Sequence, residues 1–508
     1  MICGSQKEVV KFLSSPKTFG GDAVQQINTH LSHVFLVGTR AYKIKRAVRY
    51  DFVDFSSVEK RKRACEREVA LNQRTAPEMY IGATPIYCTD DGIGWGDGGQ
   101  IIEWAVEMVR FDASDQFDEL LACGKLEKAA ILSIADKIAA FHIDAEVKSA
   151  FPLDGGVAGA LDQISSSLHD TGIGATRERD IARWTTLAFA EFEKHASLLD
   201  ARRRHGWVRH CHGDLHLANI CMFRGEPTPF DAIEFNDSLS NIDVLYDLSF
   251  LLMDIVNHNR ADLANLLLNR YLSATRDYAG LGLLRLFQSM RAAVRAMVLS
   301  LPTQAPRSQR MAERYLDLAL EYLIGGHEPE LIAIGGYSGT GKSTLAHKLA
   351  LEYDGRCGAA VLNSDVIRKR QAGCLPESAL SSESYCDAAT ESVYVQMFKD
   401  ARRTLRAGQS VLLDATFLKP IHRERAKAIA SQAGVPFKGL WLTAAREVLF
   451  GRVSGRLNGV SDADIAVLEK QLHATVEPEQ WRSVDASQTQ GATLTGALEA
   501  LSDEEDDG

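Results

Sequence analysis

Eight residues in the C-terminal half of the chain have the types and spacing to hold a phosphate group. The pattern G-x-x-x-x-G-K-[ST] is matched by Gly336-Tyr337-Ser338-Gly339-Thr340-Gly341-Lys342-Ser343. Glycines let the main chain approach an anion closely, and a helix that begins after the loop directs its N–H groups at the same point. We expect Lys342 to reach the β- and γ-phosphate oxygens of ATP and the Ser343 hydroxyl to bind Mg²⁺. The other residues of the predicted phosphate-binding site are Gly336, Ser338, Gly339, Thr340, Gly341 and Thr344.

The region around this loop, residues 329–500, resembles the small P-loop kinases, a group that includes gluconate kinase, zeta-toxin-like kinases and polynucleotide 5′-kinases. The resemblance implies that Asp365 orients the acceptor hydroxyl and takes its proton late, while Arg368 steers an anionic acceptor. It also implies that Asp414, at the end of a predicted strand, holds the water shell of the metal. The position of Asp365 equally suits the N-cap of a helix.

Two arginines four residues apart, Arg452 and Arg456, share one face of a predicted helix. In the kinases that this region resembles, a lid supplies such arginines to the transferring phosphoryl group, where they neutralise the charge that develops in the transition state. A predicted helix that starts near Ser461 is consistent with a hinged lid. A solvated helix surface would carry the same residues.

A second constellation lies in the N-terminal half, in the segment His212-Gly213-Asp214-Leu215-His216-Leu217-Ala218-Asn219-Ile220. Asp214 and Asn219 follow a predicted strand and have the spacing of the catalytic loop of kinases. Asp214 is expected to accept the proton of the acceptor hydroxyl, and Asn219 to bind Mg²⁺. The form H-G-D-x-H-x-x-N resembles the aminoglycoside phosphotransferases and their relatives, which include choline and homoserine kinases.

This second resemblance implies another metal carboxylate in the segment 229–235, which we predict to be a short strand. The I-x-F frame favours Glu234, whereas the distance from Asn219 favours Asp231, and both remain open. The resemblance also implies that Asp243 and Asp247 are helix caps or loop anchors, and that a nearby histidine, His142, makes structural hydrogen bonds.

The resemblance further requires a lysine on the third strand and a glutamate on the next helix. Lys43 and Lys45 lie on the same strand face, because side chains alternate, and the A-x-K frame favours Lys43. Glu68 is the preferred partner, with Glu66 as the alternative, and the pair would hold the α- and β-phosphates. The segment 107–109 resembles the hinge that meets adenine. Residues 29–35 contain no glycine-rich loop, which leaves a degenerate kinase possible.

The pattern of elements predicts two domains, one α+β and one α/β. Residues 1–325 are expected to form a protein-kinase-like bilobal fold, with a small lobe at about 1–108 and a helical lobe at about 109–325. A break at 325–329 precedes short apolar strands that alternate with helices, a pattern typical of a parallel sheet with helices on both faces. The P-loop domain is expected at 329–500, and residues 501–508 form an acidic tail.

The composition disfavours several other classes of protein. The 508 residues are 45% hydrophobic and 24% charged, which is typical of folded proteins. The net charge of −10 disfavours a polyanionic partner, although Arg368, Lys369 and Arg370 form a local basic run. No apolar run is long enough to span a bilayer, and the nine cysteines form no C-x-x-C pair, as suits a reducing cytosol. We therefore expect a cytoplasmic protein that acts on a small molecule.

The order of the two modules resembles bacterial proteins described as bifunctional aminoglycoside phosphotransferase/ATP-binding proteins. Each module is expected to transfer the γ-phosphoryl group of ATP to a hydroxyl with Mg²⁺. One alternative is a regulatory ATP-binding protein with a degenerate N-terminal kinase domain and a P-loop ATPase switch. Another is a kinase that acts on RNA or polynucleotide ends.

Overall fold

The computed structural model describes residues 6–50, 53–90, 92–96, 98–148, 156–301, 306–325, 328–353, 355–455, 461–474 and 478–502. The chain forms two compact units, of which unit 1 comprises Met1–Ala160 and Leu199–Leu251 and unit 2 comprises Leu161–Leu198 and Leu252–Gly508. This division differs from the expected break at 325–329, because helices of the expected helical lobe group with the P-loop domain. Among the described residues, no helix has the length and apolar character needed to cross a bilayer.

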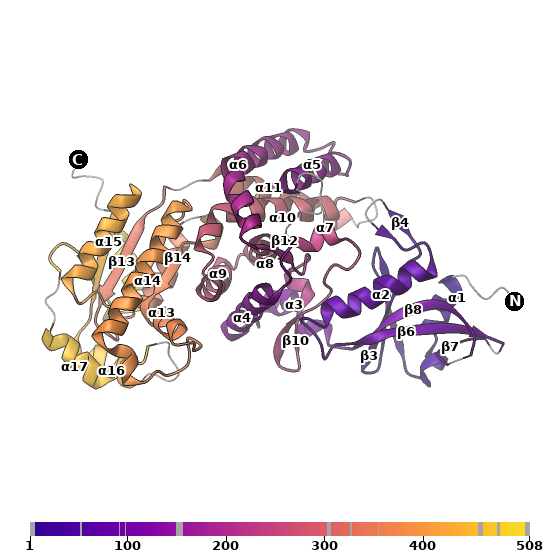
Figure 1. Ribbon diagram of the computed structural model, residues 1–508, viewed down its shortest axis with the longest axis horizontal. Coiled ribbons are helices and arrows are strands. Elements are labelled where there is room, and N and C mark those ends of the chain that lie inside the picture. Colours follow the sequence, from indigo (N-terminus) through magenta and orange to yellow (C-terminus); the bar gives the residue numbers. More distant parts are fainter. Residues whose placement is uncertain are drawn as a thin grey trace. The chain divides into compact units, whose positions relative to one another are not determined.

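Unit 1 contains an antiparallel six-stranded sheet in the order β1-β2-β3-β8-β6-β7 (Figure 1). Helix α2 (Val58–Asn72) begins at the N-cap Ser57, whose hydroxyl accepts a hydrogen bond from the Lys60 N–H. The sheet and α2 share a core that includes Cys65, Tyr80 and Val106. The strands are β1 (Val24–Asn28), β2 (Ser32–Val37), β3 (Arg40–Lys45), β6 (Tyr80–Thr89), β7 (Gly92–Gly94) and β8 (Gln100–Val109).

The rest of unit 1 positions the segment with the H-G-D-x-H-x-x-N pattern. Strand β9 (Val208–His210) pairs with β12 (Asn241–Asp243), and the hairpin β10 (Ile220–Phe223) and β11 (Glu226–Pro229) follows the segment. The strand predicted over 229–235 is wrong beyond Pro229, because Asp231 has a left-handed φ of 62°, which ends the extended chain. The other elements of this unit are α1 (Gln6–Leu13), β4 (Arg49–Tyr50), β5 (Val53–Asp54), α3 (Phe117–Ala122), α4 (Lys128–Asp144), α7 (Asp237–Ser240) and the start of α8 (Val244–Asn257).

Unit 2 contains a parallel five-stranded sheet in the order β14-β15-β13-β16-β17. All residues of β13 are buried, as expected for a central parallel strand covered on both faces. Ile332 and Ile334 of β13 pack with α12 and α18 in one core. Its strands are β13 (Leu331–Gly336), β14 (Ala360–Asn363), β15 (Val411–Asp414), β16 (Phe437–Thr443) and β17 (Arg482–Asp485). Its later helices are α12 (Lys342–Leu349), α13 (Ser364–Gln371), α14 (Asp387–Arg406), α15 (Pro420–Ala433), α16 (Arg446–Ser454), α17 (Ile465–Ala474) and α18 (Gln490–Ser502).

Helix α9 (Ala261–Thr275) covers the edge strand β14 of this sheet with two asparagines. Asn265 Nδ2 donates to the Ala359 carbonyl at 3.0 Å, and Asn269 Oδ1 accepts the Val361 N–H at 2.7 Å. An edge strand presents unpaired backbone groups, so these side chains satisfy polar atoms that the sheet leaves open. This contact explains why α9 groups with the P-loop domain. The helices α5 (Gly156–His169), α6 (Glu178–Arg204), α10 (Leu284–Leu299) and α11 (Pro306–Ile324) lie wholly or largely in the same unit.

The predicted fold class is confirmed. Unit 1 has a kinase-like arrangement of a sheet, a helix and a catalytic-type loop, and unit 2 has a parallel sheet with helices on both faces. The apolar runs 331–334, 359–362, 411–413 and 439–442, which the sequence predicts to be strands, agree with β13 to β16 within three residues, while β17 was not predicted. The acidic run of the expected tail lies outside the described residues, whereas Leu501 belongs to α18.

Candidate active sites

The phosphate loop joins the end of β13 to the start of α12, as its sequence predicts. Gly336, Gly339 and Gly341 all have positive φ, a conformation that side chains disfavour. A Cβ on Gly339 would lie 3.0 Å from Val453 Cγ2 and 3.1 Å from the Leu449 carbonyl oxygen of α16. Only glycine therefore allows α16 to pack this closely on the loop.

Two cations of the predicted site contact the loop directly. Lys342 Nζ donates to the Tyr337 carbonyl at 2.8 Å, which holds the ammonium group over the loop. Arg452 Nη1 lies 3.5 Å from the Gly339 carbonyl oxygen, so α16 brings at least one of the two predicted arginines to the phosphate cradle. Arg456 lies outside the described residues.

Asn363 links the two groups that were predicted to bind metal. Its Nδ2 donates to Ser343 Oγ at 3.2 Å and also to Asp414 Oδ2. The parallel register places Asn363 beside Asp414 at the carboxyl ends of β14 and β15. A hydroxyl and a buried carboxylate thus share one amide at the mouth of the loop, and both are oxygen ligands of the kind that Mg²⁺ prefers.

The N-cap of α13 is Asn363 rather than Asp365. Asn363 Oδ1 accepts the N–H groups of Asp365 and Val366, each at 2.9 Å. The capping alternative for Asp365 is therefore wrong, and its carboxylate is available for another role. Sequence reasoning missed Asn363, although an asparagine between a strand and a helix is a common capping signal.

The Asp365 carboxyl group lies in an environment that disfavours its charge. Burial and the negative charge of Asp414 raise its pKa above the ordinary value, and this effect outweighs a hydrogen bond from the Ser461 hydroxyl and the charges of Arg368 and Lys342. A carboxylate with a raised pKa is a better proton acceptor, which is the property that the predicted role requires.

The run Arg368, Lys369 and Arg370 does not form an exposed basic patch. Arg368 is buried, donates to the Ser384 carbonyl at 2.7 Å and lies 4.7 Å over the ring of Tyr385. Lys369 is fully buried, and Arg370 lies 3.4 Å from the Asp400 carboxylate. These cations therefore stabilise the unit internally instead of offering a surface to a polyanion.

The segment 461–474 contacts the phosphate loop through one residue and Lys369 of α13 through another. Ser338 donates its N–H to Gln471 Oε1 at 2.9 Å, and Gln471 Nε2 donates to Ser338 Oγ at 3.1 Å. Asp462 accepts hydrogen bonds from Lys369 at 3.0 Å and from the Tyr385 hydroxyl at 2.7 Å. Sequence reasoning missed both residues, because no motif marks them.

In unit 1, Lys43 lies between two carboxylates. Its Nζ is 2.8 Å from Glu68 Oε1 on α2 and 2.5 Å from Asp231 Oδ1. Burial opposes the charge of Glu68, but Lys43 and Lys45 lower its pKa to about 2. The structure thus brings together the predicted pair Lys43 and Glu68, whereas Glu66 points outward and lies 3.9 Å from Lys62.

The second lysine, Lys45, extends the same ion-pair network into the interior through Glu68. It contacts Glu68 at 2.5 Å and pairs with Glu234. Burial and the charge of Glu68 raise the pKa of Glu234, although Lys45 opposes this. The Glu234 side chain is 5% exposed and the Asp231 side chain is 41% exposed. Both carboxylates are ion-paired, and Asp231 is the more exposed of the two candidates for a metal ligand.

Asp214 and Asn219 face the same point. Asn219 Nδ2 donates to the Asp214 carbonyl and to Asp214 Oδ2, each at 2.9 Å. The Asn219 carbonyl accepts the Phe230 N–H at 2.9 Å, which fixes the backbone next to Asp231 against this loop. These hydrogen bonds hold Asp214, Asn219 and Asp231, the side chains predicted to carry acid–base and metal chemistry, close together in the chain fold.

Asp247 anchors this loop, which confirms the prediction. It accepts the N–H groups of His212 at 3.0 Å and Gly213 at 2.9 Å, and it contacts His142 Nε2 at 3.1 Å. His142, Cys211 and Asp247 lie close enough to hold a metal ion. Since both Asp247 oxygens already accept N–H groups, an anchor explains the cluster fully. Asp243 pairs with Arg202 and accepts the Leu245 N–H at the start of α8.

The segment 107–109, which was predicted to meet adenine, is the end of β8. It pairs with β3 on one side and β6 on the other, and the Val109 N–H donates to the Met79 carbonyl. Its backbone is therefore largely used by the sheet, and the N–H of the next residue, Arg110, donates to the Thr39 carbonyl at 2.9 Å.

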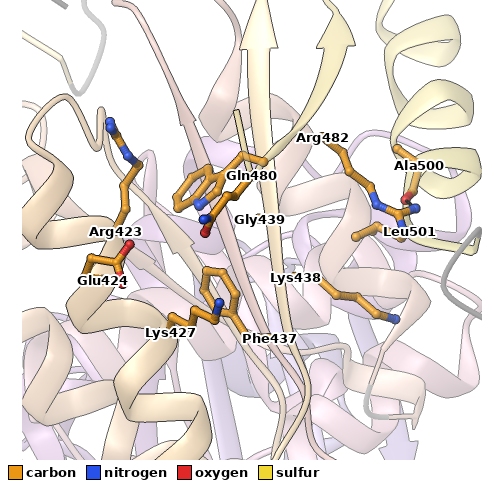
Figure 2. Close-up of a pocket in the computed structure, with 11 residues that line it drawn as sticks. Arg423, Glu424, Lys427, Phe437, Lys438, Gly439, Gln480, Arg482, Ala500 and Leu501 are labelled. Carbon is orange, nitrogen blue, oxygen red and sulfur yellow. Dashed lines mark hydrogen bonds between the residues drawn. The ribbon is translucent and has the colours of Figure 1, made fainter. Parts of the chain in front are cut away.

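A cavity of about 410 Å³ in unit 2 is lined by residues of α15, β16, β17 and α18 (Figure 2). It lies at the end of the parallel sheet opposite to the phosphate loop, since the loop follows the last residue of β13. It includes Phe437, which pairs with Leu331 at the start of β13. Several lining cations have partners within the chain: Lys438 pairs with Glu330, Arg482 donates to the Ala500 carbonyl, and Arg423 donates to the Phe417 carbonyl. The cavity is therefore not part of the transfer site.

Comparison with known proteins places the chain in a family. It is 31% identical over 444 residues to the uncharacterized protein Rv2004c of Mycobacterium tuberculosis (strain H37Rv), and the match covers 86% of each chain. The AAA domain family matches residues 331–478. Among solved structures, a gluconokinase from Sinorhizobium meliloti is 21% identical, with 35% of this chain and 94% of that chain covered and a TM-score of 0.26. A choline kinase from Cryptosporidium parvum is 12% identical, with 61% and 90% covered and a TM-score of 0.40.

The parallel sheet and the phosphate loop define a protein whose C-terminal region, residues 331–478, matches the AAA domain family. The chain belongs to the family of the mycobacterial protein Rv2004c, with which it shares most of its length.

Proposed function

We propose that this protein is an ATP-dependent phosphotransferase with two transfer sites, each of which moves the γ-phosphoryl group of ATP to a hydroxyl of a small molecule with Mg²⁺. The observation that supports this most is that each site gathers a phosphate-binding lysine together with oxygen ligands suited to Mg²⁺.

In the unit 1 site, Glu68 holds Lys43 in place for the nucleotide phosphates. Asn219 and Asp231 supply oxygen atoms for Mg²⁺, which neutralises charge on the phosphates when bound. Asp214 orients the acceptor hydroxyl and takes its proton, and its hydrogen bond from Asn219 fixes the carboxylate.

In the unit 2 site, the loop N–H groups and Lys342 bind the phosphates. Ser343 and Asp414 hold the metal and its waters, and Asn363 sets their spacing. Asp365 takes the acceptor proton, favoured by its raised pKa. Arg452 stabilises the phosphoryl group as charge develops on it.

We propose small molecules rather than polynucleotide ends as acceptors. The basic run that could have bound a nucleic acid is buried or paired, and the chain carries a net charge of −10. Cytoplasmic placement is part of the same proposal.

Labelled ATP and a metabolite extract test this function without presuming an acceptor. The wild type is compared with Asp214→Asn and Lys342→Ala, and with Lys128→Ala as a control on the exposed start of α4. We expect each site variant to lose a different labelled product and the control to lose none. Unchanged products in both site variants would exclude phosphotransfer at these sites.

One observation favours a regulatory role for unit 1. Lys43 is already neutralised by Glu68 and Asp231, as in a site that does not hold phosphates. In that case Asp214→Asn would leave all products unchanged while Lys342→Ala would abolish ATP turnover.

A further inference from the structure

Helix α17 brings a neutral side chain onto the phosphate loop. Gln471 Oε1 accepts the N–H of Ser338, the third residue of the loop, at 2.9 Å, and Gln471 Nε2 donates to the hydroxyl of the same residue. The amide oxygen thus occupies a place on a loop N–H where a phosphate oxygen could accept.

The segment 461–474 is also anchored near its N-terminal end, by Asp462. Asp462 accepts the Leu380 N–H at 3.1 Å in addition to its bonds from Lys369 and Tyr385. The charged partner Lys369 is fully buried, so this anchor is the stronger of the two contacts. A nucleotide can displace Gln471 from the loop while Asp462 keeps the segment attached.

We propose that the Gln471 side chain stays hydrogen-bonded to the phosphate loop until a nucleotide phosphate displaces it. The proposal rests on the proposed ATP site at this loop. An N–H bond to a charged phosphate oxygen is roughly twice as strong as one to a neutral amide, so the nucleotide prevails. Because two neutral hydrogen bonds must first break, Gln471 weakens ATP binding by about five- to thirtyfold.

Two substitutions of Gln471 have opposite predicted effects. Gln471→Ala removes the competitor, so ATP binds about five- to thirtyfold more tightly. Gln471→Glu can still accept the Ser338 N–H, now with a charge that also repels phosphate, so ATP binds more weakly than to the wild type. The matched control is Lys470→Ala, an exposed neighbour on α17, which is expected to change nothing.

The experiment measures equilibrium binding of a non-hydrolysable ATP analogue to the full chain, in the presence of Mg²⁺. The binding that Lys342→Ala removes from the isotherm is assigned to the phosphate loop, and it is called the loop component. Circular dichroism verifies that each variant is folded. Equal or weaker binding of Gln471→Ala in the loop component would overturn the proposal for Gln471. An isotherm that Lys342→Ala leaves unchanged would instead overturn the ATP site itself.

Hydrogen exchange provides a second readout. Addition of the analogue to the wild type is expected to speed exchange in residues 465–474, because Gln471 has left the loop. Slower exchange there would show that the nucleotide tightens this contact, and would overturn the proposal.

Discussion

Glu234 is paired with Lys45 inside unit 1, while Asp231, three residues earlier, keeps an exposed carboxylate beside Lys43. The two carboxylates, which the sequence alone leaves as equal candidates for the metal, therefore have different environments. One stabilises the interior and the other faces the site.

Substitution separates these two roles. Glu234→Gln leaves Lys45 paired with Glu68 alone, and we expect the free energy of unfolding to fall by about 2 kcal/mol, which is typical of one lost hydrogen bond to a charged group. Asp231→Asn should cost about 1 kcal/mol or less but raise the Mg²⁺ concentration needed for transfer by unit 1. Urea unfolding and Mg²⁺ titration measure the two effects. A raised Mg²⁺ requirement in Glu234→Gln with unchanged stability would reverse the assignment.

The ion pairs of Glu68 predict a loss of stability in acid. Its pKa is about 2 in the folded chain and near 4.5 when unperturbed. Since the folded pKa is lowered, the stabilisation is complete above pH 4.5 and disappears as the pH falls towards 2. The difference in unfolding free energy between the wild type and Glu68→Gln should therefore shrink over this window. The exposed Glu66→Gln serves as the control, and a difference that is independent of pH would contradict the prediction.

The raised pKa of Asp365 predicts the acid limb of the pH–rate profile of unit 2. The carboxylate form is required, so the rate should fall as the pH drops through a value above the ordinary Asp pKa of 3.8. Asp365→Asn should lower kcat by about 10²- to 10⁴-fold. Asp387→Asn, an exposed carboxylate of α14, is the control. Full activity in Asp365→Asn would remove this residue from the chemistry.

Two substitutions of Asn363 test its role as a helix cap and its role beside the predicted metal ligands. Asn363→Ala loses the cap of α13 and should cost about 1 kcal/mol. Asn363→Asp keeps a capping oxygen but replaces the donor to Asp414 with a second negative charge. We expect this variant to keep the helix cap, to be less stable than the wild type without Mg²⁺ because the two carboxylates repel each other, and to show an altered Mg²⁺ dependence. If both variants used Mg²⁺ as the wild type does, Asn363 would be a cap and nothing more.

Local spacing predicted a large part of the two sites. The phosphate loop needs glycines at fixed intervals, and Asp214 and Asn219 need a fixed separation, so a short window of sequence contains the information. The parallel strands were recognisable for a related reason, because strands buried on both faces are continuously apolar.

Contacts between distant segments were not predictable in this way. Gln471 meets Ser338 across more than one hundred residues, and neither position carries a distinctive pattern. The prediction of a strand beyond Pro229 was wrong because Asp231 adopts a left-handed backbone conformation, which the apolar pattern of the sequence does not reveal. The grouping of α9 with the parallel sheet depends on two asparagines that resemble ordinary helix surface residues.

The asparagines of α9 have a practical consequence for anyone who wishes to produce the P-loop enzyme alone. A protein cut at the glycines near residue 325 would lack Asn265 and Asn269 and would expose the bare margin of β14 to neighbouring molecules. Such a fragment would self-associate through that margin, and one that starts at residue 252 would still lack Leu161–Leu198, whose buried Trp184 donates to Ser289 of α10, so a dispersed protein requires both parts of unit 2.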